Sequence, residues 1–404
     1  AGPIPAGAEP SAAPEPVATP QPVAAPETVP PAAPLAPSGS EIGAGAGIAV
    51  VGMGIKVPGA ADPDSFFQLL LGERPVFSEP GERWDIESFW APADSGVPDS
   101  TYSRTLGFIH DEQPDGVPAQ DYTTAWLRHC LQQALAGVHR RADDRHLFAV
   151  GYTADGSQHL EEAMVWAGIE HRLAARLDPA DPATAAALHR LRRLLPHVND
   201  DPGHSLPHAV GAAAADGLLP ADTELLMLDT ACSSSLFAVE SAVQALRNGT
   251  CDVAVAGASF AVGPRHSTLF AGLHGLSASN DVRSFDAEAD GVLFSDGAAV
   301  VVLKTLDRAR ADGDHILGLL TGVGTSADGR GKAIYAPNTK GQQVAIERAW
   351  TTAGIGATDV DWVVAHGTGT RAGDQVEVKT LTAALAGHPG VWVTSNKSIV
   401  GHTG

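Results

Sequence analysis

Seven short apolar runs, spread over residues 47–395, are the feature that most constrains how this chain can fold. Each run is a few residues long and is followed by glycine or small polar residues, a pattern typical of a buried strand and a turn. The runs occupy residues 47–54, 225–231, 252–257, 298–303, 316–321, 360–365 and 391–395. Segments with helical periodicity lie between them. The sequence therefore predicts an α/β fold, with a largely parallel sheet covered by helices on both faces.

The expected helices have apolar residues at intervals of three and four. In residues 233–248 the apolar side chains fall on one face, and Gly249 supplies a stop. In residues 374–386 the spacing of Asp374 and Glu377 predicts a capping box at the helix start. Two further helical patterns occupy residues 121–137 and 156–195.

Composition excludes several classes of function. The 404 residues include 26 Lys and Arg against 47 Asp and Glu, a formal net charge of −21, which argues against nucleic-acid binding. Apolar runs stay well below the roughly 18 residues of a membrane span. Cys130, Cys232 and Cys251 lack the paired spacing of metal sites and disulfide frameworks. We therefore expect a cytoplasmic protein without a metal or a membrane partner.

Residues 1–45 differ sharply from the rest of the chain. They hold twelve of the 29 prolines, four Glu and no Lys or Arg, with few large apolar residues. Such a composition predicts a disordered Ala/Pro-rich linker between domains, followed by one domain over residues 46–404. The chain begins with Ala instead of Met, so we expect it to be part of a longer polypeptide.

Cys232 lies in LLMLDTACSSS (225–235), where an apolar strand ends and an amphipathic helix begins. A thiol at such a strand-to-helix turn is close to unpaired helix N–H groups and the positive end of the helix dipole. Both favour the thiolate, which is the nucleophilic form. Cys232 is therefore the candidate nucleophile, whereas Cys130 and Cys251 fit small core residues.

Two histidines also follow apolar strands. His366 begins HGTGT (366–370), and His402 ends KSIVGH (397–402), which starts with Lys397. Ligands of open α/β sheets bind outside the carboxyl ends of the strands, the side from which we expect these loops and the Cys232 loop to leave. Glycines let the backbone approach a ligand, and Thr368 and Thr370 carry hydroxyls that can bind a polar substrate arm.

The segments DTACSSS, HGTGT and KSIVGH resemble the three active-site signatures of the β-ketoacyl synthases, in the form found in modular and iterative type I polyketide synthases. The resemblance covers about residues 47–104 and 223–404. It implies a thiolase-like fold, with two similar βαβαβ halves in five layers, and a homodimer. It also implies that Cys232 takes an acyl chain from a carrier-protein thioester.

The same resemblance implies roles for the other site residues. His366 and His402 would assist decarboxylation of a malonyl-type thioester and stabilise the enolate that results. Lys397 would shape the electrostatics of the site, and Thr368 and Thr370 would line the phosphopantetheine arm of an acyl carrier protein. No bound cofactor is implied; the partners would be the carrier protein and neighbouring domains of the same synthase. Asp374 and Glu377 would hold the loop and helix start instead of reacting.

The chain departs from the family pattern in several places. Ile399 stands where the family usually has Asn, and Gln375 where it has Pro. The segment 105–222 lacks the family's usual motifs, and family members continue beyond the last signature, so we expect the C-terminal part of the fold to be missing. Two alternatives stay open: a non-elongating domain that binds or gates carrier-bound chains, and a cyclising acyltransferase that uses the same cysteine.

Overall fold

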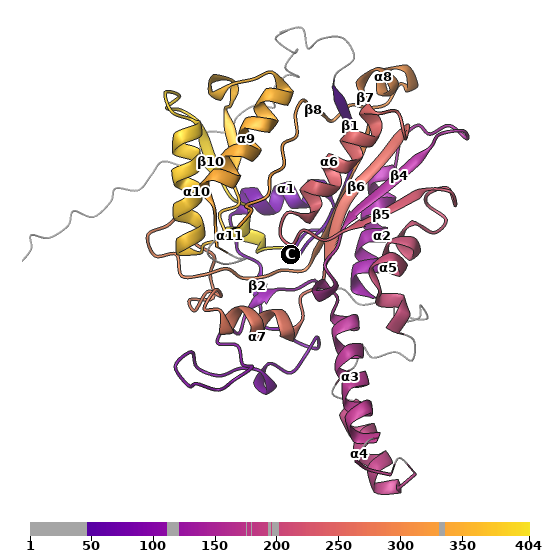
Figure 1. Cartoon of the computed structure of the whole chain (residues 1–404), viewed down its shortest axis with the longest axis vertical. Coiled ribbons are helices and arrows are strands. Elements are labelled where there is room, and N and C mark those ends of the chain that lie inside the picture. Colours follow the sequence, from indigo (N-terminus) through magenta and orange to yellow (C-terminus); the bar gives the residue numbers. More distant parts are fainter. Residues whose placement is uncertain are drawn as a thin grey trace, which may run out of the picture. The chain divides into compact units, whose positions relative to one another are not determined.

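Six of the strands form one central sheet in the order β5-β4-β6-β7-β1-β8 (Figure 1). Five of them match the apolar runs predicted within residues 47–321. The second strand in that order, β4, is an additional strand that those runs did not include. The strands are β1 (Ile48–Lys56), β4 (His146–Gly151), β5 (Glu224–Leu228), β6 (Val253–Phe260), β7 (Gly297–Thr305) and β8 (Gly318–Leu320).

The sheet is mixed, so the expectation of a largely parallel sheet is wrong. β4 pairs in parallel with β5 and β6, whereas β7 is antiparallel to β6 and β1, and β1 is antiparallel to β8. After β6 the chain forms α7 (Pro264–Gly272) and a long irregular segment before β7. β7 therefore starts at the edge of the sheet where β4, β5 and β6 end. The predicted α/β class is confirmed.

Helices cover both faces of this sheet. α2 (Tyr122–Leu135) and α5 (Pro207–Ala215) pack on one face, and α6 (Ser234–Arg247) packs on the other. Along β6, Val253 and Val255 contact the α2 side, while Ala254 and Ala256 contact the α6 side. Successive apolar residues of β6 thus pack alternately into two hydrophobic cores, as expected of a strand buried on both faces.

Gly54 explains the close approach of α2 to β1. A Cβ atom at this position would lie 2.1 Å from the carbonyl oxygen of Cys130 on α2. Cys130 itself is fully buried, and Cys251 is also buried, so the prediction that both are core residues is confirmed. The glycine-rich end of the first apolar run is thus used for packing.

The structure describes residues 47–110, 121–174, 176–178, 180–192, 195, 202–330 and 336–404. The linker predicted over residues 1–45 lies outside them. Over the described residues, no helix has the length and apolar character needed to cross a membrane. The remaining helices are α1 (Pro63–Gly72), α3 (Gln158–Ala174), α4 (Pro182–Arg192), α8 (Leu306–Asp312), α9 (Thr339–Ala353), α10 (Arg371–Ala384) and α11 (Lys397–Val400), with 3-10 turns η1 (Ile86–Ser88), η2 (Ala154–Gly156), η3 (Pro202–Ser205) and η4 (Ala357–Asp359).

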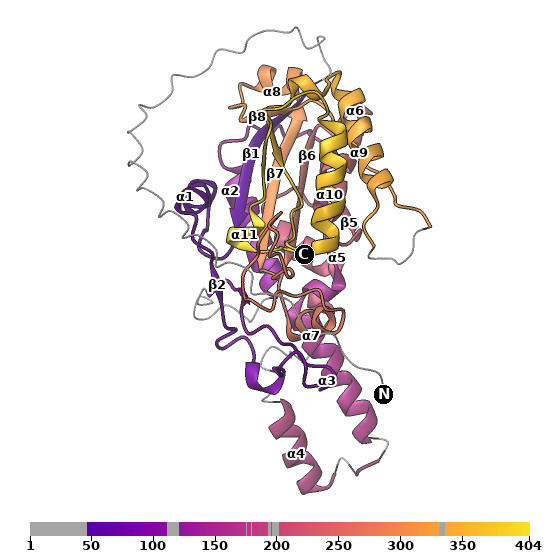
Figure 2. The same ribbon diagram turned by 90° about the vertical axis from the view of Figure 1, so that its left-hand side faces the viewer.

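The helical pattern predicted over 156–195 forms two helices, α3 and α4. They lie beside one another and extend away from the central sheet (Figures 1 and 2). Arg192 of α4 lies over the ring of Trp166 of α3, 5.8 Å from its centroid. These two helices therefore contact each other outside the central sheet.

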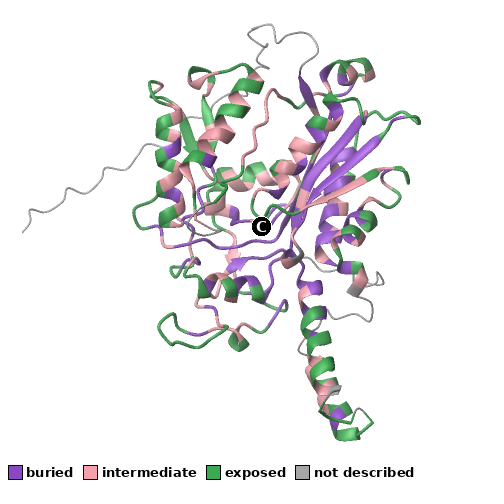
Figure 3. Ribbon diagram, in the orientation of Figure 1, coloured by how far each residue is buried: buried purple, intermediate pink, exposed green. Residues whose placement is uncertain are grey.

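Two small sheets lie outside the central one. β2 (Phe77–Ser78) pairs antiparallel with β3 (Leu106–Gly107), and β9 (Trp362–Val364) pairs in parallel with β10 (Trp392–Thr394). The inner strands β4, β6, β7 and β1 are largely buried, whereas much of β9 and β10 is exposed (Figure 3). Trp362 is 62% exposed and Trp392 is 76% exposed. The two predicted strands that deliver the histidine loops therefore belong to a separate sheet.

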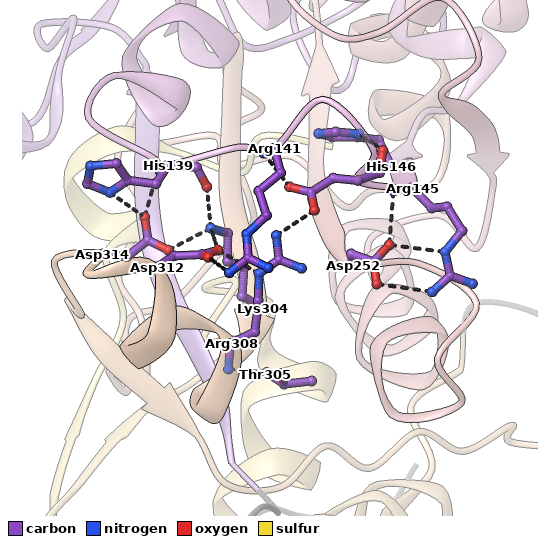
Figure 4. Close-up of polar contacts among 11 residues, drawn as sticks. His139, Arg141, Arg145, His146, Asp252, Lys304, Thr305, Arg308, Asp312 and Asp314 are labelled. Atoms are coloured by element: carbon purple, nitrogen blue, oxygen red, sulfur yellow. Dashed lines mark hydrogen bonds and ion pairs between the residues drawn. The ribbon is translucent and has the colours of Figure 1, made fainter.

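A buried charge cluster lies at the carboxyl end of β7. The Nζ atom of Lys304 donates to the carboxylates of Asp312, at 2.8 Å, and Asp314, at 2.6 Å, and to the carbonyl of His139 (Figure 4). The Lys304 side chain has no exposed surface. The three donor positions of its ammonium group are thus all occupied.

Two arginines complete this charge cluster. Arg308 contacts Asp144 at 2.5 Å and Asp312 at 2.7 Å, and Arg141 also pairs with Asp312 (Figure 4). Burial raises the pKa of Asp312, but hydrogen bonds from Lys304, Arg308 and Arg141 outweigh it and hold that pKa well below its usual range. The cluster links α8 to the loop between α2 and β4.

Candidate active site

Cys232 lies in a sharp turn between β5 and α6, as the sequence predicted. Ala231, just before it, has a φ of 52°, in the left-handed region that non-glycine residues rarely adopt. Hydrogen bonds hold this turn: the Thr230 N–H donates to the Ser234 hydroxyl at 2.9 Å, and the Ala231 N–H donates to the Asp229 carboxylate at 3.0 Å. The strained backbone therefore presents the thiol at the start of α6.

The neighbouring strand β4 supports the same turn. A Cβ atom on Gly151, its last residue, would lie 2.6 Å from the carbonyl carbon of Ser234. Only a glycine lets the end of β4 approach the first turn of α6 this closely. Cys232 is thereby placed at the carboxyl end of two adjacent parallel strands.

The thiol of Cys232 does not have the lowered pKa that its place at the helix start led us to expect. Although the residue is exposed, the surrounding protein desolvates the thiol and raises its pKa, while the positive charge of Lys397 lowers it. The desolvation is the larger effect. The expectation of a stabilised thiolate is therefore wrong, because the positive charge of Lys397 does not offset the cost of burying the negative charge of the thiolate.

Two carboxylates hold the loop that carries His366. Glu377 accepts hydrogen bonds from the N–H groups of His366, at 2.7 Å, and Gly367, at 2.8 Å. Asp374 accepts from the N–H groups of Phe285, at 2.7 Å, and Gly369, at 3.2 Å. The prediction that these carboxylates fix the loop is confirmed.

The predicted capping box is wrong. α10 begins at Arg371 with Thr370 as its N-cap, so Asp374 and Glu377 both lie inside the helix. Their side chains face the preceding loop instead of the helix start, because that loop has several backbone N–H groups to satisfy. The spacing of Asp374 and Glu377 correctly predicted that both side chains bind backbone N–H groups. Those groups belong to the preceding loop and to Phe285 instead of the helix start.

Thr368 and Thr370 lie side by side on this loop. Their hydroxyl oxygens are 2.9 Å apart and hydrogen-bond each other. Thr368 is 8% exposed. The structure thus places the two threonines next to His366, where the sequence analysis expected a substrate arm.

His402 lies on a short loop after α11, against the segment that precedes β7. Its backbone N–H donates to the Leu293 carbonyl at 2.9 Å, and its carbonyl accepts from the Ser295 N–H at 2.8 Å. Its Nδ1 accepts a hydrogen bond from the Gly404 N–H at 3.1 Å. A neutral ring with this bond carries its proton on Nε2.

The Nε2 atom of His402 is buried and has no hydrogen-bond partner among the described residues. The side chain is 4% exposed, and a buried unpaired N–H group is costly. Such a group in a folded protein calls for an explanation, and a ligand that accepts a hydrogen bond is one. His402 therefore presents a free donor to the site.

The two site histidines are neutral at ordinary pH. Burial lowers the pKa of His366 to about 4, with a further contribution from Lys397. Burial lowers the pKa of His402 well below its usual value, and His366 and Lys397 act in the same direction. Burial likewise lowers the pKa of Lys397, against the opposing effect of Glu377. Neutral imidazoles can donate hydrogen bonds to a developing oxyanion.

The structure brings the predicted site residues together. The rings of His366 and His402 are edge to face, with centroids 5.4 Å apart. Lys397 interacts electrostatically with Cys232, His366 and His402. Loops from two separate sheets thus converge on one place, and the catalytic roles assigned to them stay predictions.

Three aromatic neighbours of the site were not singled out from the sequence. Phe285 has a φ of 63° and supports the His366 loop through its N–H group. The ring of Phe294 lies 5.4 Å from that of His402, and His266 contacts Phe294 on its other side. His266 follows the apolar run 252–257, so its strand-end position was a signal available in the sequence.

Family models identify the chain as a member of the β-ketoacyl synthases. The family model for the β-ketoacyl synthase N-terminal domain matches residues 46–309, and that for the C-terminal domain matches residues 317–404. The chain belongs to this family. Its thiolase-like fold agrees with that of its solved neighbours.

Curated relatives are large polyketide synthases. The chain is 32% identical over 372 residues to the phenolphthiocerol synthesis polyketide synthase type I Pks15/1 of Mycobacterium bovis, covering 88% of this chain and 16% of the relative. It is 33% identical over 382 residues to the pikromycin polyketide synthase component PikAIII of Streptomyces venezuelae, covering 88% of this chain and 22% of that protein. The chain thus spans less than a quarter of either relative.

Solved ketosynthases have the same fold. The oxazolomycin ketosynthase domain OzmH KS7 of Streptomyces albus matches with a TM-score of 0.70 and 29% identity, over 88% of this chain and 59% of that one. The ishigamide ketosynthase/chain length factor matches with a TM-score of 0.72 and 25% identity, over 89% and 82% of the two chains.

Proposed function

We propose that this chain is a ketosynthase domain that extends acyl chains by decarboxylative condensation. In the first step the Cys232 sulfur attacks the carbonyl carbon of an acyl thioester on a carrier protein. A new carbon–sulfur bond forms to Cys232, and the phosphopantetheine thiol of the carrier leaves with the proton. The exposed position of Cys232 at the start of α6 supports this role.

In the second step a malonyl-type carrier thioester binds with its carbonyl oxygen facing His366 and His402. The bond to the carboxylate carbon breaks, carbon dioxide leaves, and the electron pair forms an enolate. The enolate carbon then attacks the acyl group on Cys232, a carbon–carbon bond forms, and the Cys232 sulfur leaves. Thr368 and Thr370 would bind the phosphopantetheine arm beside these histidines.

The observation that carries the proposal is the unpaired Nε2–H of His402. A donor that is already desolvated and fixed by the Gly404 N–H needs no reorganisation as negative charge develops on the enolate oxygen. A neutral imidazole is also better suited than a cation here, because it binds the thioester carbonyl without attracting the malonyl carboxylate that must leave. Lys397 would supply the fixed positive charge of the site.

The open edge of β5 supports a homodimer. β5 is the outermost strand of the central sheet and pairs on one side with β4. An unpaired strand edge is a template for pairing with another chain, and a second copy would satisfy it. The carrier protein and neighbouring synthase domains are the other partners that we propose. Sedimentation of the wild-type protein against a variant with Pro at Met227 would test the dimer, since the N–H group of Met227 faces away from β4 and Pro removes it.

Covalent acylation tests the nucleophile. Incubation with an acyl thioester followed by intact-protein mass spectrometry should give one acyl adduct on the wild-type protein and none on Cys232→Ala. Cys130→Ala and Cys251→Ala are the matched controls and should keep the adduct, because both thiols are buried in the core. An adduct on Cys232→Ala would overturn the assignment.

Product analysis tests the reaction itself. With acyl-carrier and malonyl-carrier thioesters together, a condensing enzyme releases carbon dioxide and forms a β-ketoacyl thioester. Acylation without any carbon dioxide release would instead favour a chain-binding domain, and ring closure without it would favour a cyclising acyltransferase.

A further inference from the structure

A third histidine, His266, lies one ring layer behind His402. It belongs to α7, and its ring contacts those of Phe260, at 4.8 Å between centroids, Phe270, at 6.1 Å, and Phe294, at 5.3 Å. Phe294 in turn contacts His402 at 5.4 Å. His266 is 8% exposed. A polar ring is thus enclosed in an aromatic box that adjoins the site.

The topology places His266 at the same edge of the sheet as Cys232. β4, β5 and β6 are parallel, so their carboxyl ends share one edge. Cys232 follows β5, and His266 follows β6 by six residues. His402 is bridged to Phe294, just before β7 begins at that edge. The acyl chain that we propose on the Cys232 sulfur would therefore start at the sheet edge where His266 lies.

The ring nitrogens of His266 have different surroundings. Nδ1 is buried and has no hydrogen-bond partner among the described residues. Burial lowers the pKa of His266 to about 4, against the opposing effect of the charge and backbone of Asp155, so the ring is neutral. We place its single proton on Nε2, toward Asp155, because Asp155 favours a proton on the ring. Nδ1 is therefore a lone pair that accepts a hydrogen bond.

The partner of this lone pair must be a neutral donor. A keto oxygen cannot donate, and an ammonium group would be costly to bury among three phenylalanine rings. A hydroxyl group fits, because it donates one hydrogen bond and has a small desolvation cost. A saturated chain in the same place would leave Nδ1 buried and unpaired, a loss that sites built to bind a hydroxyl use to reject the analogue that lacks it.

We infer that His266 is a specificity-determining residue whose Nδ1 accepts a hydrogen bond from a hydroxyl group on the acyl chain carried by Cys232. The inference rests on the proposed acylation of Cys232 and gives that substrate a chemical class, hydroxylated acyl thioesters. His402 and His266 then have complementary tasks. His402 donates to a carbonyl oxygen, and His266 accepts from a hydroxyl further along the chain.

The test measures acylation rates of Cys232 in the intact protein by mass spectrometry. The probes are N-acetylcysteamine thioesters of hexanoic acid and of its β-hydroxy and δ-hydroxy derivatives, which share one chain length. We expect one hydroxylated probe to react about five- to tenfold faster than the saturated probe. This rate ratio corresponds to the net free energy of one hydrogen bond to a buried acceptor. His266→Phe, which keeps an aromatic ring and removes the acceptor, should bring this ratio to about one.

Two further variants make the result specific. In His266→Asn the side-chain oxygen replaces the Nδ1 acceptor, so part of the preference should return. His208→Phe, at an exposed histidine on α5, should keep the full preference. Equal rates for all three probes on the wild-type protein would overturn the inference and leave the proposed function standing, as would a preference that persists in His266→Phe. Failure of every probe to acylate Cys232 would overturn both.

Discussion

The two ends of β7 hold buried polar clusters of opposite design. At its carboxyl end Lys304 meets two carboxylates and a carbonyl, and the arginines Arg308 and Arg141 complete the charge balance. At its amino end His402 and His266 each keep one buried nitrogen without a partner in the described part of the chain. A cluster with every donor satisfied stabilises the fold, whereas unpaired groups are available to a ligand.

This difference separates the residues that maintain the structure from those that act on substrate. A perturbed pKa or a buried charge alone does not separate them, since both clusters are desolvated. Their hydrogen bonds do separate them: the Lys304 ammonium has three acceptors, while the His402 Nε2–H has none among the residues that the structure describes. Substitutions in the two clusters should therefore affect different properties of the protein.

The largest expected effect is on stability, at Lys304. Lys304→Met removes one charge and leaves Asp312 and Asp314 buried beside each other without their ammonium partner. We expect the free energy of unfolding to fall by about 3–5 kcal/mol, as when one partner of a buried ion pair is removed. Denaturant titration measures this. A loss below about 1 kcal/mol would mean that the cluster does not stabilise the fold as its geometry indicates.

The next effect is on activity, at His402. His402→Ala removes the free donor, and we expect malonyl-thioester decarboxylation to slow by about 10²–10³-fold, the usual cost of losing one preorganised donor to an oxyanion. His402→Gln, whose amide N–H can reach a similar position, should recover part of the rate. Both variants should unfold with a smaller loss of stability than Lys304→Met. Carbon dioxide release at the wild-type rate in His402→Ala would remove His402 from the mechanism.

A smaller effect should appear in the pH dependence of stability. Burial lowers the folded-state pKa of His266 from 6.5 to about 4, so between these pH values the unfolded chain binds more protons than the folded chain. The contribution of His266 to the free energy of unfolding therefore falls as the pH is lowered, by at most about 1.4 kcal/mol per pH unit. His366 and His402 act in the same direction.

Glu161 opposes this trend, because burial raises its pKa to about 7 and its contribution falls as the pH rises from 4.5. The difference between the wild-type protein and His266→Phe cancels Glu161 and isolates His266. We expect this difference to change between pH 6.5 and 4 and to be constant above pH 7. A difference that is flat over the whole range would show that His266 is not desolvated in the folded protein.

The smallest effect is expected at a surface ion pair beside the Lys304 cluster. Arg145 contacts Asp252 at 3.0 Å, but its side chain is 57% exposed (Figure 4). Water and salt screen such a pair, so Arg145→Met should change stability far less than Lys304→Met, and less still in high salt. Equal losses in the two variants would mean that burial does not set the strength of these contacts.

Local patterns predicted much of the fold and the site. The apolar runs located five of the six central strands, and the amphipathic pattern of 233–248 located α6, because burial imposes these patterns residue by residue. Three short signatures also located Cys232, His366 and His402, since strand ends and glycines mark where backbone meets ligand. The strand direction in the sheet and the partners of Asp374 and Glu377 were predicted wrongly.

The sequence by itself determined the α/β class, the core positions and the side chains that meet at the site, because each depends on local spacing. Tertiary structure alone decided the antiparallel placement of β7, the raised pKa of Cys232 and the unpaired nitrogens of His402 and His266. These properties depend on which distant groups surround an atom and on how much water they exclude. His266 illustrates the point. In GPRHSTLF it looks like an ordinary helical residue. In the folded protein, Phe260 and Phe294 from other segments and Phe270 from the next turn of α7 surround its ring and make its Nδ1 a buried acceptor.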